Sequence, residues 1–256
     1  MSEGKAMPTE IRLSDRVGHD RWQTAQAWER EHWLRDQEGL AKYGKNYIWR
    51  ILSLFGRVDK YRGDDRNQWW KESFEGYRFL PPTVENALEV GCGPYTNLRL
   101  IRGVCKPKHI FLSDPLVRTY VKFKMTFVSE MHREGLCCID DHPLEALPFA
   151  SSYFDLAVMI NVLDHVQDAG LCMENLLRVI KPGGFVVIGQ DLTNEEDFRR
   201  QPEGLQIGHP VTLDEDWFAP YLKGTFEGVI HKVLPRQSGW APDWHYGTLI
   251  FAGRKR

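Results

Sequence analysis

The sequence predicts an α/β fold: a seven-stranded, mainly parallel sheet with helices on both faces, preceded by a helical cap. From Asn86 onward, short apolar runs alternate with helical patterns, as they do in β-α-β units. The first 80 residues hold six of the nine tryptophans at helical spacings, without a convincing strand. Pro81-Pro82 separates the two parts, because proline lacks a backbone donor and interrupts a helix. We therefore expect a Trp-rich helical cap at residues 1–80 and a sheet domain at residues 81–256.

Seven short runs supply the strands of the expected sheet. They are Ala87–Val90, His109–Leu112, Leu136–Ile139, Asp155–Ile160, Phe185–Gly189, Thr225–Leu234 and Thr248–Ala252. One long helical pattern runs from Leu116 to Met131. Another ends at Ile180, because Pro182-Gly183-Gly184 cannot continue a helix. In the cap, the apolar residues from Tyr47 to Phe55 lie on one helix face and predict a helix there.

Composition excludes several classes of protein. With 256 residues, 27% charged and 42% hydrophobic, the chain has the composition of a globular protein with a substantial core. Lys and Arg number 33 against 35 for Asp and Glu, so the basic surface that nucleic-acid binding usually needs is missing. The five cysteines are odd in number and lack paired spacing, which predicts neither disulfides nor a metal site. We expect no nucleic-acid partner.

No targeting or membrane segment is visible in the sequence. The first 30 residues are rich in charge and contain no apolar core of a signal peptide. The most apolar stretch, Phe154–Leu163, is far shorter than the roughly 20 residues that cross a bilayer. We expect a cytoplasmic protein without membrane insertion. The sequence carries no signal for its oligomeric state.

The most informative segment is Leu88–Asn97, where a predicted strand runs into a glycine turn and then a helix. Glycines at 91 and 93 let the backbone approach a ligand at the carboxyl end of the strand. A dinucleotide-binding turn would place a third glycine at position 96, which is Thr96. The carboxylate of Glu89 beside the turn also repels a diphosphate and suits a cationic ligand. This pattern disfavours a nicotinamide cofactor.

Further motifs follow the turn in a fixed order. They are Asp114 at the end of the second strand, Leu147-Pro148-Phe149, Tyr153-Phe154-Asp155-Leu156, Asn161 to Val166, and Leu177 to Gly184. Together with Glu89-x-Gly91-x-Gly93, these motifs resemble those of the class I S-adenosylmethionine-dependent methyltransferases, in particular the group that acts on small molecules. The resemblance covers about residues 84–190. It implies a Rossmann-like fold with S-adenosyl-L-methionine as cofactor.

The resemblance also implies cofactor-binding residues. Glu89, Gly91 and Gly93 correspond to the motif that lines the methionine and ribose portion of the cofactor. Asp114 corresponds to the acid that binds both ribose hydroxyls, and Asn161 lies in the segment after strand four that lines the active site.

Two positions depart from the family pattern. Tyr95 stands where the family often has a third glycine. Pro143 stands where the family has the acid that contacts the adenine amine. Asp140, Asp141 or Glu145 is the candidate replacement for that acid, and Asp141 and Glu145 rank equally.

Candidate catalytic and substrate-binding residues lie beside the expected cofactor site. Asp164 and His165 follow strand four, and a histidine oriented by a carboxylate can remove a proton from an acceptor. The alternative for His165 is a packing or capping role at the next helix. We assign substrate contacts to Trp70 in the cap, to Asp191 after strand five and to His209 in a later turn, where solvated turns are the alternative.

The sequence therefore predicts a methyltransferase that modifies an oxygen or nitrogen of a small molecule, with a sugar or glycan hydroxyl among the candidates. In-line transfer from a sulfonium needs no metal, and none is expected. A non-catalytic S-adenosylmethionine-binding protein is the alternative that the motifs leave open. An NAD-dependent oxidoreductase is a weaker alternative, because Thr96 breaks its fingerprint.

Overall fold

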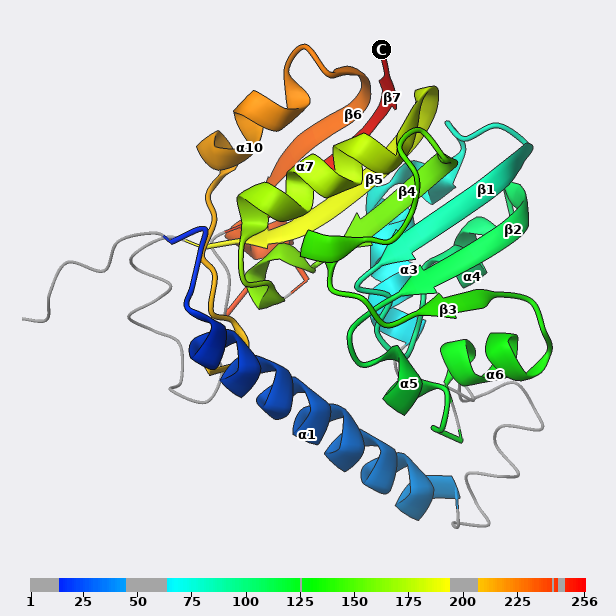
Figure 1. Ribbon diagram of the computed structural model, residues 1–256, viewed down its shortest axis with the longest axis vertical. Coiled ribbons are helices and arrows are strands. Elements are labelled where there is room, and N and C mark those ends of the chain that lie inside the picture. Colours follow the sequence, from blue (N-terminus) through cyan, green and yellow to red (C-terminus); the bar gives the residue numbers. More distant parts are fainter. Residues whose placement is uncertain (1–13, 45–63, 125, 194–206, 241, 244–246) are drawn as a thin grey trace, which may run out of the picture.

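One seven-stranded sheet forms the centre of the computed structural model (Figure 1), which describes residues 14–44, 64–124, 126–193, 207–240, 242–243 and 247–256. The strand order is β3-β2-β1-β4-β5-β7-β6. The strands are β1 (Thr83–Val90), β2 (Lys106–Ser113), β3 (Cys138–Asp140), β4 (Phe154–Ile160), β5 (Ile180–Leu192), β6 (Phe226–Pro235) and β7 (Gly247–Lys255). The predicted α/β class with seven strands is confirmed, and each strand overlaps its predicted run.

The strand directions explain where ligands can bind. The pairs β1·β2, β1·β4, β2·β3 and β4·β5 are all parallel, and within the described residues β7 runs opposite to the other six strands. The parallel strands therefore end at one edge of the sheet. The strand order reverses direction at β1, and β4 lies on its other side, so the carboxyl ends of β1 and β4 flank the switch point where open α/β sheets bind ligands.

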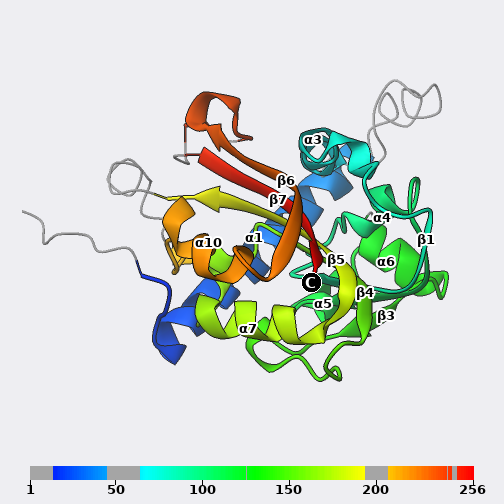
Figure 2. The same ribbon diagram turned by 90° about the horizontal axis from the view of Figure 1, so that it is seen from above.

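Helices cover both faces of the sheet, as Figure 2 shows from above. One face packs against α7 and α10, and the other against α3, α4, α5 and α6. The helices are α1 (His19–Gly44), α3 (Asp64–Ser73), α4 (Leu98–Ile101), α5 (Val117–Tyr120), α6 (Phe127–Arg133), α7 (Ala169–Val179) and α10 (Glu215–Leu222). Short 3-10 turns occupy Glu75–Tyr77, Leu144–Ala146, Leu163–His165 and Arg236–Ser238.

The helix α1 lies across the edge of the sheet where the parallel strands end (Figure 1). Its Gln26 Nε2 donates to the carbonyl of His165, 3.2 Å away, just after β4. Near its start, Arg21 Nη1 donates to the carbonyl of Ile207 at 2.7 Å. The helix thus covers the region where the sequence predicted a ligand.

The described part of the predicted cap shares its core with the sheet. Trp70, Phe74 and Tyr77 are buried in one cluster with side chains of β1, β2 and β4. The aromatic ring of Trp70 lies against Gly189 of β5. The proposed boundary at residue 80 stays a prediction, because packing is continuous across it.

The long helix predicted from Leu116 to Met131 is wrong. The chain forms α5 and then starts again at α6, because Thr126 is extended and its hydroxyl accepts from the backbone N–H of Ser129 as an N-cap. The helix predicted from Tyr47 to Phe55 lies outside the described residues. None of the helices in the described ranges has the length and apolar character that a bilayer crossing requires.

Candidate active site

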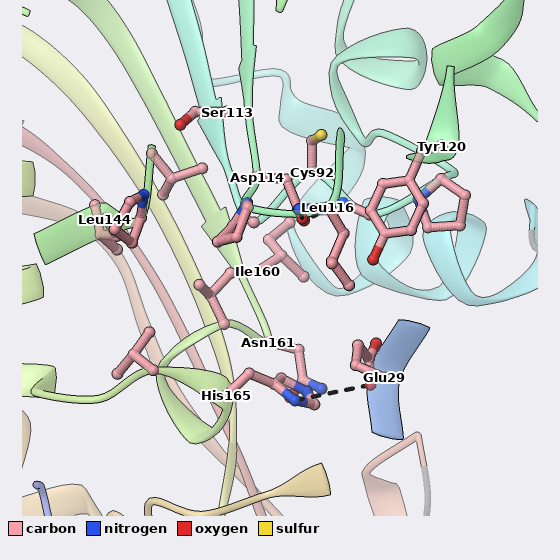
Figure 3. Close-up of a pocket in the computed structure, with 18 of the residues that line it drawn as sticks. Glu29, Cys92, Ser113, Asp114, Leu116, Tyr120, Leu144, Ile160, Asn161 and His165 are labelled. Atoms are coloured by element: carbon pink, nitrogen blue, oxygen red, sulfur yellow. Dashed lines mark hydrogen bonds and ion pairs between the residues drawn. The ribbon is translucent and has the colours of Figure 1, made fainter. Parts of the chain in front are cut away.

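A cavity of about 210 Å³ lies at the carboxyl ends of β1, β2 and β4. Its floor is the turn after β1, and its walls come from the segments that follow β2, β3 and β4. Side chains of α1 and α3 complete it on the side away from the sheet. Figure 3 shows how these segments surround one space, with Asp114 on one wall and His165 and Glu29 on the opposite side.

The glycine turn has the backbone that the sequence predicted. Gly91 and Gly93 both have positive φ, 59° and 52°, which a side chain disfavours. A Cβ on Gly91 would lie 2.4 Å from a methyl carbon of Val162, so this position is closed by packing. A Cβ on Gly93 would meet no atom within 4 Å, so it would project into open space at the cavity. Gly91 therefore shapes the turn, and Gly93 keeps room for a ligand.

The carboxylate of Glu89 lies beneath the turn and not on the cavity wall. It accepts hydrogen bonds from the backbone N–H groups of Asn97, at 2.9 Å, and Leu98, at 3.0 Å, and from the hydroxyl of Thr96. Burial raises the pKa of this carboxyl, while the donors oppose that change. The predicted direct cofactor contact of Glu89 is therefore corrected to a role in holding the turn. The sequence signal for this structural role was the pair Thr96 and Asn97, because both residues carry side-chain donors that can bind the carboxylate of Glu89.

Asp114 stands on the cavity wall directly beside the turn (Figure 3). Its Oδ2 accepts from the backbone N–H of Gly93 at 3.1 Å, and its Oδ1 from that of Leu116 at 2.8 Å. Burial raises the pKa of Asp114 to about 6, against the effect of these two donors. The carboxylate is thus fixed in orientation and lies where a ligand with paired hydroxyls would reach it.

The two acids predicted to contact adenine are placed differently. Asp141 pairs with Arg118 and does not line the cavity, so its predicted ligand contact is corrected to a surface ion pair. Glu145 does line the cavity, but its Oε1 accepts from the backbone N–H groups of Gln167, at 2.7 Å, and Asp168, at 3.1 Å. The sequence analysis missed His142, whose ring lines the cavity and whose Nδ1 lies 2.7 Å from Asp140 Oδ1.

Asn161 and Trp70, both predicted as site residues, line the cavity. Asn161 has a φ of 56°, and its Oδ1 accepts from the backbone N–H of Asp191 at 3.2 Å. The Asp191 side chain, predicted to contact substrate, is buried away from the lining. It accepts from Thr248 Oγ1 and from Arg66 Nη2, each at 3.1 Å. Arg66, and not Asp191, reaches the cavity, so the predicted contact of Asp191 is corrected to a role through Arg66.

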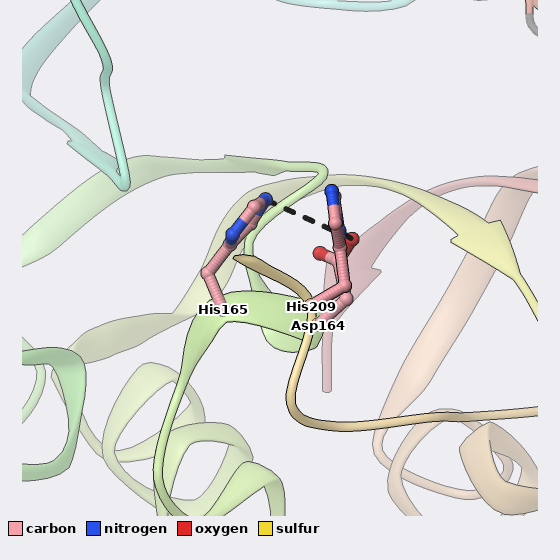
Figure 4. Close-up of side chains that lie close together, drawn as sticks. All are labelled: Asp164, His165 and His209. Atoms are coloured by element: carbon pink, nitrogen blue, oxygen red, sulfur yellow. Dashed lines mark hydrogen bonds and ion pairs between the residues drawn. The ribbon is translucent and has the colours of Figure 1, made fainter. Parts of the chain in front are cut away.

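Asp164, His165 and His209 come together although His209 lies 45 residues beyond Asp164 (Figure 4). Asp164 Oδ2 is 2.6 Å from His209 Nδ1 and 3.7 Å from His165 Nε2. Of the three, His165 lines the cavity. Asp164 and His165, predicted as a catalytic pair, are therefore part of a triad. The shortest contact in this triad joins Asp164 to His209, the residue predicted for substrate binding.

The charges of this triad depend on one another. Burial by itself would raise the pKa of Asp164, but His165 and His209 lower it well below its ordinary value. Burial opposes protonation of His165, yet Asp164 and Glu29 raise its pKa above 6.5. For His209, burial and the neighbouring His165 lower the pKa. A buried carboxylate with two imidazoles can hold one positive charge, and His165 carries it more readily than His209.

One face of α1 also lines the cavity, and the sequence analysis missed it. Trp22, Gln26, Glu29 and Trp33 recur at helical spacing and all border the space. Trp33 Nε1 donates to Glu29 Oε1 at 2.6 Å, and Glu29 Oε2 lies 3.9 Å from His165 Nδ1. This spacing was visible in the sequence. What the sequence did not show was that α1 lies over the sheet edge.

Tyr95, which replaces a frequent glycine of the family pattern, joins the turn to α1. Its ring borders the cavity and lies 5.8 Å from that of Trp33, centroid to centroid. Its hydroxyl donates to Asp36 Oδ2 at 3.2 Å. The side chain is 6% exposed, so it closes this wall instead of leaving the turn open.

Residues 88–188 match the family described as Methyltransferase domain, Methyltransf_11. The chain contains a methyltransferase domain. The match begins in β1, includes the glycine turn, Asp114 and the segment with Asp164 and His165, and ends in β5. Together with the fold, it confirms the resemblance to class I methyltransferases that the motifs predicted.

Curated proteins and solved structures named as methyltransferases are also similar to this chain. The 2-methyl-6-phytyl-1,4-hydroquinone methyltransferase of Synechocystis is 25% identical over 185 residues, which are 68% of this chain and 54% of that protein. The structure of the N-methyltransferase NodS from Bradyrhizobium japonicum with S-adenosyl-L-homocysteine matches with a TM-score of 0.54 and 18% identity, over 85% of this chain and 97% of that one. This chain spans about half or less of the length of the curated relatives it matches.

A second similar structure has a different activity. The [4+2]-cyclase SpnF matches with a TM-score of 0.54 and 18% identity, over 74% of this chain and 80% of that one. These structural similarities show a shared fold. A shared fold does not fix the chemistry, which depends on the site residues of each protein.

Proposed function

We propose that this protein transfers a methyl group from S-adenosyl-L-methionine to an oxygen or nitrogen of a small molecule. The observation that carries the proposal is the position of Asp114. Its carboxylate is fixed by Gly93 and Leu116 on the wall of the cavity, immediately beside the one turn glycine that faces open space. A carboxylate in this place can accept from two vicinal ribose hydroxyls, as the family resemblance implies.

The cofactor fits the residues around the turn. Gly93 leaves space for the ribose and methionine portion, and Asn161 borders the same space from the end of β4. The adenine would lie toward His142 and Leu144, in the segment after β3. We propose that His142, held by Asp140, contacts the adenine in place of the missing acid at Pro143. Glu89 holds the turn and does not touch the cofactor.

The acceptor would bind between Trp70, Arg66 and His165, on the side of the cavity away from Asp114. Trp22 and Trp33 add apolar walls that exclude water from the sulfonium. An acceptor oxygen or nitrogen forms a bond to the methyl carbon, and the electron pair of the carbon–sulfur bond passes to sulfur, which leaves as a neutral thioether. The acceptor's proton passes to His165 Nε2, which lies 3.7 Å from Asp164 Oδ2.

Calorimetric titration with S-adenosyl-L-homocysteine, followed by incubation with methyl-labelled cofactor and a panel of phenols, sugars and amines, tests the proposal. We expect binding in the micromolar range and label transfer to at least one class of acceptor. Binding without label transfer to any acceptor would support the non-catalytic alternative. Failure of the folded protein to bind either sulfur compound would refute the proposal.

A further inference from the structure

The triad Asp164, His165 and His209 has the composition of a metal site as well as that of a proton relay. One ligand atom from each residue lies within 4.8 Å of the other two. Asp164 Oδ2 is 2.6 Å from His209 Nδ1 and 3.7 Å from His165 Nε2. Atoms bound to one transition-metal ion at about 2.1 Å are roughly 3 Å apart, so small rotations of these side chains would enclose an ion.

Hydrogen bonds around the triad fix which atoms of its side chains face one another. His165 Nδ1 lies 3.0 Å from the carbonyl oxygen of Gly208. Because a carbonyl can only accept, Nδ1 carries the proton and the lone pair of a neutral ring is on Nε2, the atom on the side of Asp164. Asp164 Oδ1 accepts from Gln190 Nε2 at 3.0 Å, which leaves Oδ2 toward the two rings. Metal-binding histidines usually have such a carbonyl partner, and metal-binding carboxylates such a donor.

The environment gives an ion both protein ligands and free coordination positions. Asp164 is 5% exposed, and the side chains of His165 and His209 are 19% and 18% exposed. His165 borders the cavity, so a bound ion would face the space proposed for the acceptor. Three ligands from the protein with positions open toward a cavity is the arrangement of catalytic metal sites.

We propose that Asp164, His165 and His209 bind one divalent transition-metal ion at the acceptor side of the cavity. Two imidazoles and one carboxylate favour the series from manganese to zinc over magnesium or calcium, which prefer oxygen ligands. To bind an ion through Nδ1, the neutral ring of His209 would carry its proton on Nε2 in place of the Nδ1 proton that now faces Asp164 Oδ2. Glu29, whose Oε2 is 3.9 Å from His165, adds negative charge on the cavity side.

A second group of acids and a histidine in the described residues is a weaker candidate. Asp140, Asp141 and His142 also bring three ligand atoms within 4.8 Å, but they are more exposed. Asp141 is paired with Arg118, and Asp140 accepts from Ser113 Oγ at 2.9 Å. Arg118 and Ser113 already occupy the carboxylates of this more exposed group, so we assign it no ion.

The ion deepens the proposed function, and its use in catalysis depends on that function. An ion on Nε2 of His165 occupies the lone pair that would otherwise take the acceptor's proton. With the ion bound by Asp164, His165 and His209, a hydroxyl acceptor that coordinates it would have a lowered pKa and could lose its proton to solvent without a protein base. The ion would thus favour hydroxyl-bearing acceptors, whose oxygen becomes nucleophilic when the proton leaves.

Titration of the chelator-treated full-length protein with Zn²⁺ and Co²⁺ tests the site. We expect one ion per chain, with the affinity lowered at least tenfold in His209→Ala and in His165→Ala, and close to the wild-type value in His142→Ala. No stoichiometric binding to the folded wild type, wild-type affinity in His209→Ala, or loss of binding in His142→Ala would overturn the inference. Circular dichroism in chelator checks that each variant is folded.

A second measurement keeps all three proposed ligands, so it does not depend on whether their variants fold. In nitrogen-detected NMR of the histidine rings, Zn²⁺ is expected to shift the signals of two rings, and His142→Ala is expected to leave both shifts in place. Shifts that disappear in His142→Ala contradict the assignment. Titration with S-adenosyl-L-homocysteine needs no metal, so cofactor binding without metal binding refutes only this inference, and metal binding without cofactor binding refutes only the proposed function.

Discussion

Asp164 makes its shortest contact with His209, 2.6 Å from Oδ2 to Nδ1, although His165 is its neighbour in the chain. The contact joins the end of β4 to a loop 45 residues later and brings that loop to the acceptor side of the cavity. Because Gln190 Nε2 donates to the other oxygen, at 3.0 Å, both oxygens of this buried carboxylate have partners. The triad therefore holds two distant segments of the chain together and is also a candidate reactive group.

We predict that Asp164→Asn lowers the free energy of unfolding by about 1–3 kcal/mol, because an amide has one acceptor oxygen and leaves a buried donor unpaired. Urea denaturation measures the change. Asp141→Asn is the matched control: Asp141 is in an exposed pair with Arg118, so the expected change is clearly smaller than that of Asp164→Asn. Equal stability of the two variants would contradict the structural role of Asp164.

Stability should also fall in acid through Asp164. The pKa of Asp164 is lowered in the folded protein by His165 and His209, which outweigh the effect of burial. Its contribution to stability is therefore complete above the unfolded pKa, about 3.9, and is lost as the pH falls toward the lower pKa of the folded state. Denaturation of the wild type and of Asp164→Asn between pH 5 and about 3 should show a smaller acid loss in the variant. The same dependence of stability on pH in the wild type and in Asp164→Asn would show that the acid loss does not come from Asp164.

Asp114 should have the opposite effect. Burial raises its pKa from 3.8 to about 6, so the unfolded chain loses this proton at lower pH than the folded one. The contribution of Asp114 to the free energy of unfolding is therefore complete below about pH 4 and is lost as the pH rises to about 6. At neutral pH the loss is about 3 kcal/mol, because one pKa unit corresponds to about 1.4 kcal/mol. Asp114→Asn should remove this slope and, in calorimetry, weaken S-adenosyl-L-homocysteine binding at least tenfold. A variant that keeps the cofactor affinity of the wild type would show that Asp114 does not hold the ribose.

Cofactor affinity of the wild type should fall below pH 6 for the same reason. The ribose hydroxyls donate to the ionised carboxylate, and protonation of Asp114 removes one acceptor. Calorimetric titrations from pH 5 to 8 measure this dependence. An affinity that does not change between pH 5 and 7 contradicts the assigned role.

The Gly93→Ala variant tests whether the glycine turn binds cofactor or only shapes the fold. The new Cβ meets no atom in the free protein but occupies the space assigned to the cofactor. We expect at least a tenfold loss of cofactor affinity with a strain cost of about 1 kcal/mol from the positive φ. Gly224→Ala is the matched control, because its φ is 83° and its Cβ would also meet no atom within 4 Å, far along the chain from the turn. Similar cofactor affinities for Gly93→Ala and Gly224→Ala would contradict the assignment of the turn to cofactor binding.

Much of the fold was predictable because it depends on local patterns. Apolar runs predicted all seven strands, and the helix end predicted at Ile180 lies one residue from the end of α7 at Val179, although β5 starts at Ile180 and not at the predicted Phe185. The helix expected through Leu116 and Met131 failed because the apolar spacing continues across Thr126, while the hydroxyl of Thr126 starts a new helix. A side-chain cap inside an apolar pattern is not visible in periodicity alone.

The candidate site was predicted where a motif places a residue on the sheet edge, as for Gly93, Asp114 and Asn161. It was missed where a role depends on distant packing. Glu89 lies in β1 and Asp191 in β5, near the carboxyl ends of these strands, but Thr96 and Arg66 donate to their carboxylates, and neither carboxylate lines the cavity. The pairing of Asp164 with His209 and the position of α1 above the edge depend on contacts across the whole chain.

The most direct test of the account is calorimetric titration of the folded protein with S-adenosyl-L-homocysteine and NADH, beside the Asp114→Ala variant. We predict micromolar binding of the sulfur compound, its loss in the variant and no binding of NADH. Binding of NADH, or S-adenosyl-L-homocysteine binding that Asp114→Ala leaves intact, would contradict the central claim that the cavity beside Gly93 and Asp114 is the cofactor site of a methyltransferase.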